Sequence, residues 1–155
     1  MPNWSFNALL VHNDDLDKIV SGEDKIDFNR WKPMPESLMV TFGSVSKLAE
    51  KLYSGQIDSL DERALGGFDY YRDGEQVRVD CPTPDDVYEF GKLLHENQAA
   101  YGFSNWYDWR CAIWGTKWNG GTAHLSKVDD AHTLVEFDTA WCPPMGVLGD
   151  MLCRR

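Results

Sequence analysis

The stretch from Tyr101 to Asn119 holds four of the chain's seven tryptophans and reads YGFSNWYDWRCAIWGTKWN. A tryptophan side chain buries a large apolar area, and its indole N–H requires a hydrogen-bond partner when the ring is buried. A cluster this dense is therefore either the centre of a core or the anchor of a binding surface. In both cases the rest of the fold has to be built around it.

Helix signals divide this stretch. Gly102 and Gly115 can each end a helix, because glycine adopts the left-handed conformation that closes one, and Ser104 or Asn105 can cap the start of the helix between them. At about 100° per residue, the helix carries Trp106, Trp109, Arg110 and Ile113 on one face, with Trp114 at its margin.

Two interpretations of this face follow. In the first, the helix is part of the core and the Arg110 guanidinium stacks on buried indoles, since aromatic stripes at helical spacing are typical of cores. In the second, Trp109, Trp114 and Trp118 form the floor of a groove for a ligand or partner, and Lys117 supplies its charge. The second interpretation predicts a binding site at Trp109, Arg110, Trp114, Lys117 and Trp118.

Several motifs extend this pattern over nearly the whole chain. They are Met1-Pro2-Asn3-Trp4 with Asn7, Pro33-Met34-Pro35-Glu36, Tyr101-Gly102 with Trp106 to Arg110, Trp114 to Asn119, and Thr139-Ala140-Trp141-Cys142-Pro143-Pro144. In this order they resemble the YubB-like family. Members of that family are carried by phages, plasmids and integrated elements, and their domain is described as ferredoxin-like. The Trp-Gly-Thr-Lys-Trp block is the most specific of these motifs.

The resemblance implies a fold and a biological setting but no catalytic residue. It implies one YubB-like, ferredoxin-like domain over residues 1–155, encoded by a mobile genetic element. In the family, the segment after the Pro-Pro pair continues into a further helix and strand, whereas this chain ends at Arg155. We therefore expect the last position of the sheet to be missing or to be filled by a partner chain, so the chain is a monomer or a homodimer.

A length of 155 residues suits a single domain. No apolar run approaches the roughly 20 residues that span a bilayer, and the N-terminus lacks the pattern of a signal peptide, so we expect a cytoplasmic protein of the host cell with no membrane partner. The four cysteines are scattered and include no Cys-x-x-Cys pair. This spacing predicts reduced thiols that behave as small apolar side chains, with neither disulfides nor a zinc site.

The net charge of −10 disfavours direct binding to DNA. Affinity for phosphates depends on clustered lysine and arginine side chains that release counterions, and this chain has an excess of carboxylates. The carboxylates are either a solubilising surface or an imitation of a phosphate backbone presented to a nucleic-acid-binding enzyme.

The hydrophobic patterning indicates an α+β fold, in which an antiparallel sheet carries helices on one face, with insertions and a short C-terminal helix. Alternation predicts a strand over residues 3–12 with Trp4 at its buried end, and another over residues 133–141 with Val135, Phe137, Thr139 and Trp141 toward the core. Further strands are expected at 26–32, 68–71, 76–80 and 122–128, a short extended piece at 38–42, and helices after Asn13, at 44–53, from Thr83 to Tyr101 and at 145–152.

Catalytic chemistry has weak support. His124, Glu136 and Asp138 fall on the polar face of one expected hairpin, where a histidine near two carboxylates could accept a proton or bind a metal. Solvated cross-strand pairs of this kind are common on sheets that face water. Cys111 has no basic neighbour that would activate it, and Gly115-Thr116-Lys117 lacks the remainder of a phosphate-binding loop. We therefore expect no enzyme activity, no metal and no cofactor.

Three functional hypotheses remain. The first is a non-enzymatic accessory protein that binds a host protein and inhibits a nucleic-acid-handling or defence complex, for example of the CRISPR type, by acidic mimicry. The second is a ferredoxin-like module that stacks single-stranded bases on Trp118 and clamps them with Lys117 and Arg110. The third is a small hydrolase that uses His124. The charge opposes the second hypothesis, and no nucleophile supports the third, so the first is favoured.

Overall fold

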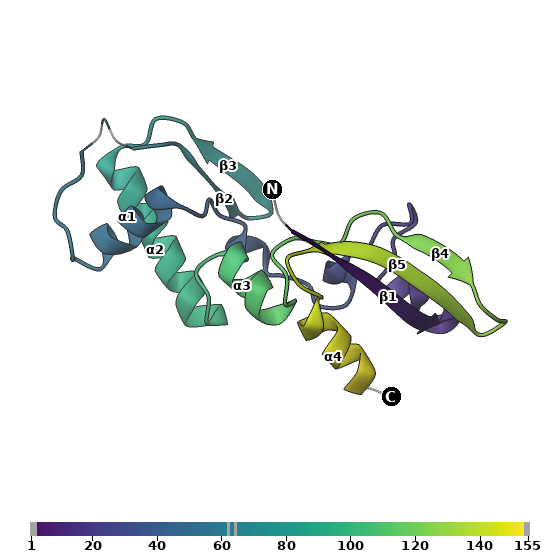
Figure 1. Cartoon of the computed structure of the whole chain (residues 1–155). Coiled ribbons are helices and arrows are strands. Elements are labelled where there is room, and N and C mark those ends of the chain that lie inside the picture. The colour runs from purple at the N-terminus through teal and green to yellow at the C-terminus, as the bar shows by residue number, and fades with distance from the viewer. Residues whose placement is uncertain (1–2, 62, 64, 154–155) are drawn as a thin grey trace. The chain divides into compact units, whose positions relative to one another are not determined.

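The computed structural model describes residues 3–61, 63 and 65–153 (Figure 1). Its contacts divide the chain into two compact units, one formed by Met1–Pro33 with Arg110–Arg155 and the other by Met34–Trp109. The predicted mixture of helices and antiparallel strands is confirmed, but the strands form two small sheets where the sequence led us to expect one. The expectation of one domain over the whole chain stays a prediction.

The first unit is built on a three-stranded antiparallel sheet. Its strands are β1 (Trp4–His12), β4 (His124–Lys127) and β5 (His132–Ala140), and β5 lies between the other two (Figure 1). The register pairs Trp4 with Ala140 and His12 with His132 across β1 and β5. The strands predicted at 3–12, 122–128 and 133–141 are therefore present, with slightly shorter bounds.

The face of β1 that enters the core is not the one with the larger side chains. Asn7 and Val11 are buried, whereas Trp4, Phe6 and Leu10 are 61%, 66% and 54% exposed, so the prediction of a buried Trp4 is wrong. Asn7 sits opposite Phe137 on the core face of β5, and its Nδ2 donates to Phe137 O (3.2 Å) and to Thr139 Oγ1 (2.9 Å). The Asn7 amide can be buried because its hydrogen bonds are made. Side chains alternate between the two faces of a strand, so the even-numbered residues of β1 then point outward.

Short 3-10 helices replace two elements that were predicted after β1. The helix expected after Asn13 is the 3-10 helix η1 (Asn13–Lys18), and the strand expected at 26–32 contains the 3-10 helix η2 (Phe28–Arg30). Asp27 Oδ1 accepts from the Asn29 N–H (3.1 Å), and Asn119 Oδ1 accepts from the Phe28 N–H (2.7 Å). These side-chain bonds compete with the backbone ladder that a strand would need.

The core of this unit contains Trp114 and the start of α4 (Met145–Cys153). The Trp114 ring meets Phe28 edge-on, with ring centroids 5.6 Å apart. The predicted position of Trp141 on the core face is wrong, because β5 ends at Ala140 and Trp141 has a left-handed backbone (φ 71°) that carries its ring to the surface. The predicted C-terminal helix is confirmed as α4.

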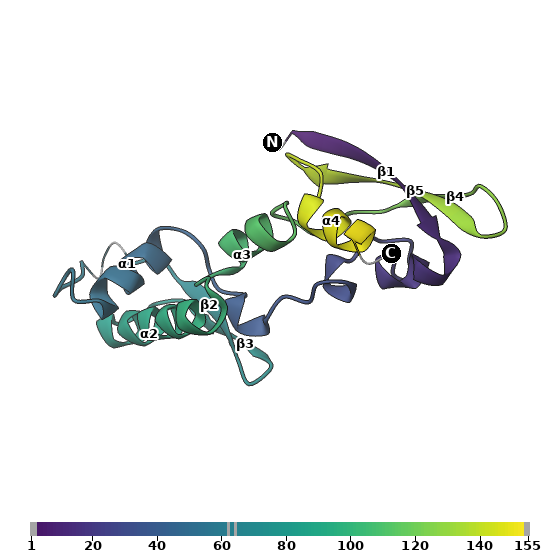
Figure 2. The same ribbon diagram turned by 90° about the horizontal axis from the view of Figure 1, so that it is seen from below.

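The second unit packs two helices on a two-stranded sheet. The helices α1 (Ser44–Tyr53) and α2 (Pro84–Tyr101) lie side by side (Figures 1 and 2), and the predicted hairpin is β2 (Phe68–Arg72) with β3 (Glu75–Val79). The 3-10 helix η3 (Glu36–Leu38) and an irregular segment replace the extended piece expected at 38–42. The core of the unit consists of Val40, Val45, Ala49, Phe68, Val87, Phe90 and Leu94.

The predicted helix ends in this unit are largely confirmed. Thr83 caps α2 through a reciprocal pair of bonds with Asp86, and Gly102 closes the helix in the left-handed conformation. The cap of α1 is Gly43 and not Ser44, and the Gly43 N–H donates to Ser46 Oγ (3.0 Å). The helix α3 (Trp106–Ile113) crosses the division between the units.

Candidate binding surface

The tryptophan-rich stretch is split between interior and surface. Trp109 and Trp114 are buried, at 8% and 0% exposure, and Trp114 Nε1 donates to Lys32 O (3.0 Å). The Arg110 Cζ lies 4.8 Å from the Trp114 ring centroid, and burial lowers the pKa of the guanidinium. Trp109, Arg110 and Trp114 match the core interpretation, because the two buried rings expose too little surface to form the floor of a groove.

Lys117 and Trp118 lie at the surface and meet two residues from other parts of the sequence. The Lys117 Nζ is 4.1 Å from the Trp118 ring centroid and 3.9 Å from that of Trp141, which follows β5. Trp4, at the start of β1, approaches Trp118 with centroids 6.2 Å apart. We call Trp4, Lys117, Trp118 and Trp141 the aromatic cluster; its three indoles are 61%, 39% and 51% exposed in chain order.

The aromatic cluster continues into the outer face of β1. Phe6, the small Ala8 and Leu10 follow Trp4 on the same face of the strand at every second residue, and all are exposed. We call Trp4, Phe6, Ala8 and Leu10 the open sheet face. Large apolar side chains that remain exposed together on one face are a mark of surfaces that bind other molecules.

Carboxylates border this apolar face. Phe6 pairs with Asp138 and Ala8 with Glu136 in the register of β1 and β5. A shallow hollow of about 360 Å³ is lined by Phe6, Glu136 and Asp138 together with His124. The surface therefore combines exposed aromatic rings with negative charge at its margin.

His124 lies on the sheet where the sequence placed it. His124 lies opposite Glu136 in the register of β4 and β5, as predicted, but within the described residues no hydrogen bond joins it to Glu136 or Asp138. No group of three or more metal-ligating side chains occurs in residues 3–61, 63 and 65–153 either.

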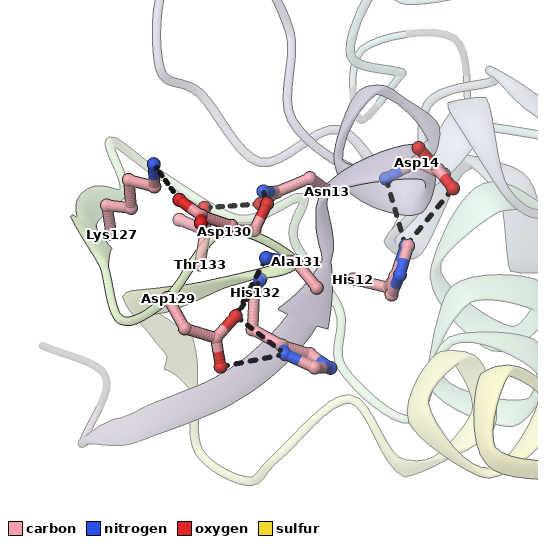
Figure 3. Close-up of polar contacts among 9 residues, drawn as sticks. All are labelled: His12, Asn13, Asp14, Lys127, Asp129, Asp130, Ala131, His132 and Thr133. Atoms are coloured by element: carbon pink, nitrogen blue, oxygen red, sulfur yellow. Dashed lines mark hydrogen bonds and ion pairs between the residues drawn. The ribbon is translucent and has the colours of Figure 1, made fainter.

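The polar cluster at the far end of the sheet has a structural explanation (Figure 3). Asp129 accepts from the backbone N–H groups of Ala131 and His132 (both 2.8 Å) and pairs with His132 Nδ1 (3.0 Å). The bonds from Ala131, and then from His132, lower the pKa of Asp129. Asn13 Nδ2 donates to Asp130 O (3.0 Å), which joins the start of η1 to this turn. These contacts fix the β4–β5 turn.

The cysteines lie mostly at the surface, whereas the sequence led us to expect small apolar side chains. Cys81, Cys142 and Cys153 are exposed and Cys111 is partly exposed. The Cys142 Sγ donates to Gly115 O at 2.9 Å, which ties the chain after β5 to the end of the tryptophan-rich helix.

Sequence reasoning missed Trp4, Phe6 and Trp141 as surface residues. The signal available for Trp4 and Phe6 was the amide at Asn7, which indicates a pairing with polar partners inside the sheet and thereby fixes the opposite face as the outer one. For Trp141 the signal was the Pro143-Pro144 pair, which ends a strand and leaves the residues before it free to turn.

The chain matches no protein-family profile, no curated protein and no solved structure in comparisons with each. Among the described helices, none combines the length and the apolar character that crossing a bilayer requires.

Proposed function

We propose that this chain is a non-enzymatic accessory protein of a mobile genetic element, of the YubB-like kind, and that it binds a host protein through the aromatic cluster and the open sheet face. The observation that carries the proposal is the exposure of three indoles beside Phe6 and Leu10 on one continuous surface. Indole rings are the side chains most enriched at the energetic centres of protein interfaces.

Charge indicates the kind of partner. The chain carries a net charge of −10, and Glu136 and Asp138 border the apolar face. A partner that presents an apolar patch with a basic rim would be complementary in both respects. Host proteins that handle nucleic acid, including defence complexes of the CRISPR type, have such basic surfaces, and acidic mimicry of a phosphate backbone would inhibit them.

The order of elements supports the ferredoxin-like assignment. The succession β1, α1, β2, β3, α2 and β5 follows the β-α-β-β-α-β order of that fold, with α3 and β4 inserted before the last strand. The strands form two sheets, β1-β5-β4 and β2-β3, where that fold has one. The proposed site of action is the host cytoplasm, in keeping with the mobile-element setting that the sequence motifs imply.

Binding of single-stranded nucleic acid is the second candidate. Lys117 between Trp118 and Trp141 is an arrangement on which bases could stack beside a cation. The net charge opposes it, because only local positive charge would attract phosphates.

A capture experiment with matched variants tests the proposal. The tagged chain is incubated with host lysate, the captured protein is identified and purified, and its affinity is measured for the wild type, for Trp118→Ala/Trp141→Ala, and for Val128→Ser as a control with an exposed apolar residue at the β4–β5 turn. We expect the double variant to lose at least about tenfold in affinity and the control to bind as the wild type does.

Equal affinity of all three proteins would contradict the proposal. A parallel titration with a fluorescent single-stranded oligonucleotide separates the second candidate. Affinity for the oligonucleotide that falls steeply with added salt and is lost in Trp118→Ala/Trp141→Ala would favour nucleic-acid binding over protein binding.

A further inference from the structure

A pocket lies between the two helices of the second unit. Its volume is about 440 Å³, and its lining residues all belong to Met34–Trp109, so it is a feature of that unit alone. Neither the aromatic cluster nor the open sheet face contributes a residue to it. Sites for small molecules are typically concave, with volumes of about 300–1,000 Å³. The pocket therefore has the size of a small-molecule site.

The side of α2 that approaches α1 forms the floor of this pocket. Gly91, Leu94, His95 and Gln98 follow one another at the spacing of a single helix face, and all four line the pocket. Gly91 packs so closely on α1 that a Cβ there would lie 2.1 Å from Ala49 O. Gly91 and Leu94 are buried, whereas His95 and Gln98 are exposed. The floor is therefore apolar and the rim on the side of α2 is polar.

The side of α1 that lines the pocket carries two lysines. Lys47 and Lys51 are four residues apart, so they lie one turn apart on the same face of the helix. Within the described part of the chain, neither ammonium makes an ion pair or a hydrogen bond. Other lysines of this acidic chain do meet carboxylates, namely Lys18, Lys25, Lys32 and Lys127. The pocket thus has two cations whose charge is not neutralised by an ion pair.

Ser104 adds a buried donor to the same pocket. The residue is 9% exposed, and its Oγ accepts from Asn105 Nδ2 (3.2 Å). A hydroxyl can donate as well as accept, and buried polar groups are normally paired. Among residues 3–61, 63 and 65–153, the Ser104 O–H has no acceptor. An oxygen atom of a ligand in the pocket would supply one.

We propose that this pocket binds a small organic phosphate, in which a flat ring carries a phosphate group, as in a nucleoside monophosphate. A phosphate has a charge of about −1.5 to −2 near neutral pH and three accepting oxygens. This charge matches the ammonium groups of Lys47 and Lys51 together, whereas a carboxylate would match only one of them. The ring of the ligand would cover Leu94 and the ring of Tyr53, which also lines the pocket.

Glu50 is the acidic residue in the lining. With Lys47 and Lys51 it leaves the described lining residues with one net positive charge, in a chain whose net charge is −10. The pocket is therefore a local exception to the repulsion that an anion meets elsewhere on this protein. Since Glu50 opposes the phosphate, its replacement by glutamine should strengthen binding.

Calorimetric titration of the full chain with adenosine 5′-monophosphate tests the proposal. We expect a dissociation constant below about 1 mM. Lys47→Met and Lys51→Met should each weaken binding at least about fivefold, because each removes a charge-assisted hydrogen bond. Lys92→Met is the matched control, since Lys92 is an exposed lysine of α2 outside the lining, and it should bind as the wild type does. Glu50→Gln should bind at least about twofold more tightly.

Two further probes separate the phosphate from the ring. Adenosine lacks the charge and inorganic phosphate lacks the ring, so each should bind at least about tenfold more weakly than the monophosphate. Adenosine as tight as the monophosphate would overturn the role of the lysines, and inorganic phosphate as tight would overturn the role of the apolar floor. A wild-type dissociation constant above about 10 mM would overturn the proposal as a whole. So would lysine variants that bind as the wild type does.

Amide chemical shifts measured by NMR during the same titration locate the site. The amides of residues 47–54 and 91–98 should shift, whereas those of β1 and β5 should not. Shifts confined to the aromatic cluster would contradict the assignment to this pocket. The variant Trp118→Ala/Trp141→Ala should bind the monophosphate normally, and Lys51→Met should bind the captured host protein normally, so the two proposals can fail separately.

Discussion

The Lys117 ammonium lies 3.9 Å from the centroid of the Trp141 ring, and the ring of Trp118 lies at a similar distance from the same nitrogen. Two indoles from separate segments are thereby held around one cation at the surface. This contact explains how exposed rings can keep a fixed arrangement, which a binding surface needs if it is not to lose conformational entropy on association.

Lys117→Met should measure the strength of this contact. The substitution keeps an apolar side chain of similar length and removes the charge, so it should lower the free energy of unfolding by about 0.5–1 kcal/mol for each exposed cation–π pair. Urea denaturation gives the value. Lys127→Met is the matched control, because its ammonium pairs with the exposed Asp130, and its effect should stay within about 0.5 kcal/mol. Equal effects of the two substitutions would show that the indoles do not hold the cation.

Two glycines of α4 should respond in opposite directions to alanine. A Cβ at Gly146 would lie 2.0 Å from Ile113 O, whereas a Cβ at Gly149 would have no atom within 4 Å. Gly146→Ala should therefore destabilise the protein by about 2 kcal/mol or more, because backbone cannot move aside easily. Gly149→Ala should stabilise it by about 0.5–1 kcal/mol through helix propensity. Thermal unfolding of both variants decides the matter, and a harmless Gly146→Ala would mean that α4 does not start against Ile113.

The contact between α1 and α2 gives a similar prediction for the second unit. A Cβ at Gly91 would lie 2.1 Å from Ala49 O, so Gly91→Ala should cost about 2 kcal/mol or more and separate the two helices. Gly66→Ala, where a Cβ meets nothing within 4 Å, is the control and should be close to neutral. The measurement is the midpoint of urea unfolding followed by circular dichroism. Equal midpoints for Gly91→Ala and the wild type would contradict the close packing of these helices.

Asp129 should make stability depend on pH in the acid range. Its pKa is lowered in the folded state, so its ionised form stabilises the fold above the unfolded pKa of about 3.9, and that contribution is lost as the pH falls through the lower folded value. Asp129→Asn keeps an oxygen for the Ala131 and His132 N–H groups but has no charge. The difference between the urea midpoints of the wild type and this variant should be constant near neutral pH and should shrink below about pH 4. A difference that does not change with pH would rule out the proposed role of the charge.

The parts of the fold that depend on local signals were predictable from the sequence. Thr83 with Pro84 and Asp86 carries a complete helix start within four residues, and Asp73-Gly74 carries a hairpin turn, so α2 and the β2–β3 pair appear where they were expected. Asn105 caps α3 through the Asp108 N–H (3.0 Å), as one of the two proposed caps. Each of these elements is determined by residues close together in the chain.

The parts that depend on distant partners were not predictable. The inward face of β1 is determined by hydrogen bonds between Asn7 and residues about 130 positions away. The strand expected at 26–32 is interrupted at Phe28, because its N–H donates to the side chain of the distant Asn119. Hydrophobicity alone favours burying Trp4 and Phe6. Among the binding residues, Lys117 and Trp118 were predicted from their spacing in the sequence. Their contacts with Trp4 and Trp141 were not predicted, because they arise from the pairing of β1 with β5, which are far apart in the sequence.

The central claim is that the aromatic cluster and the open sheet face together form the surface that meets a host protein. Fluorine NMR of the chain labelled with 5-fluorotryptophan tests it most directly, once the captured partner is purified. The resonances of Trp4, Trp118 and Trp141 should be sensitive to a soluble paramagnetic agent in the free chain and protected from it in the complex, while those of Trp109 and Trp114 should be insensitive in both. A complex in which the three exposed indoles remain as accessible as before would contradict the account.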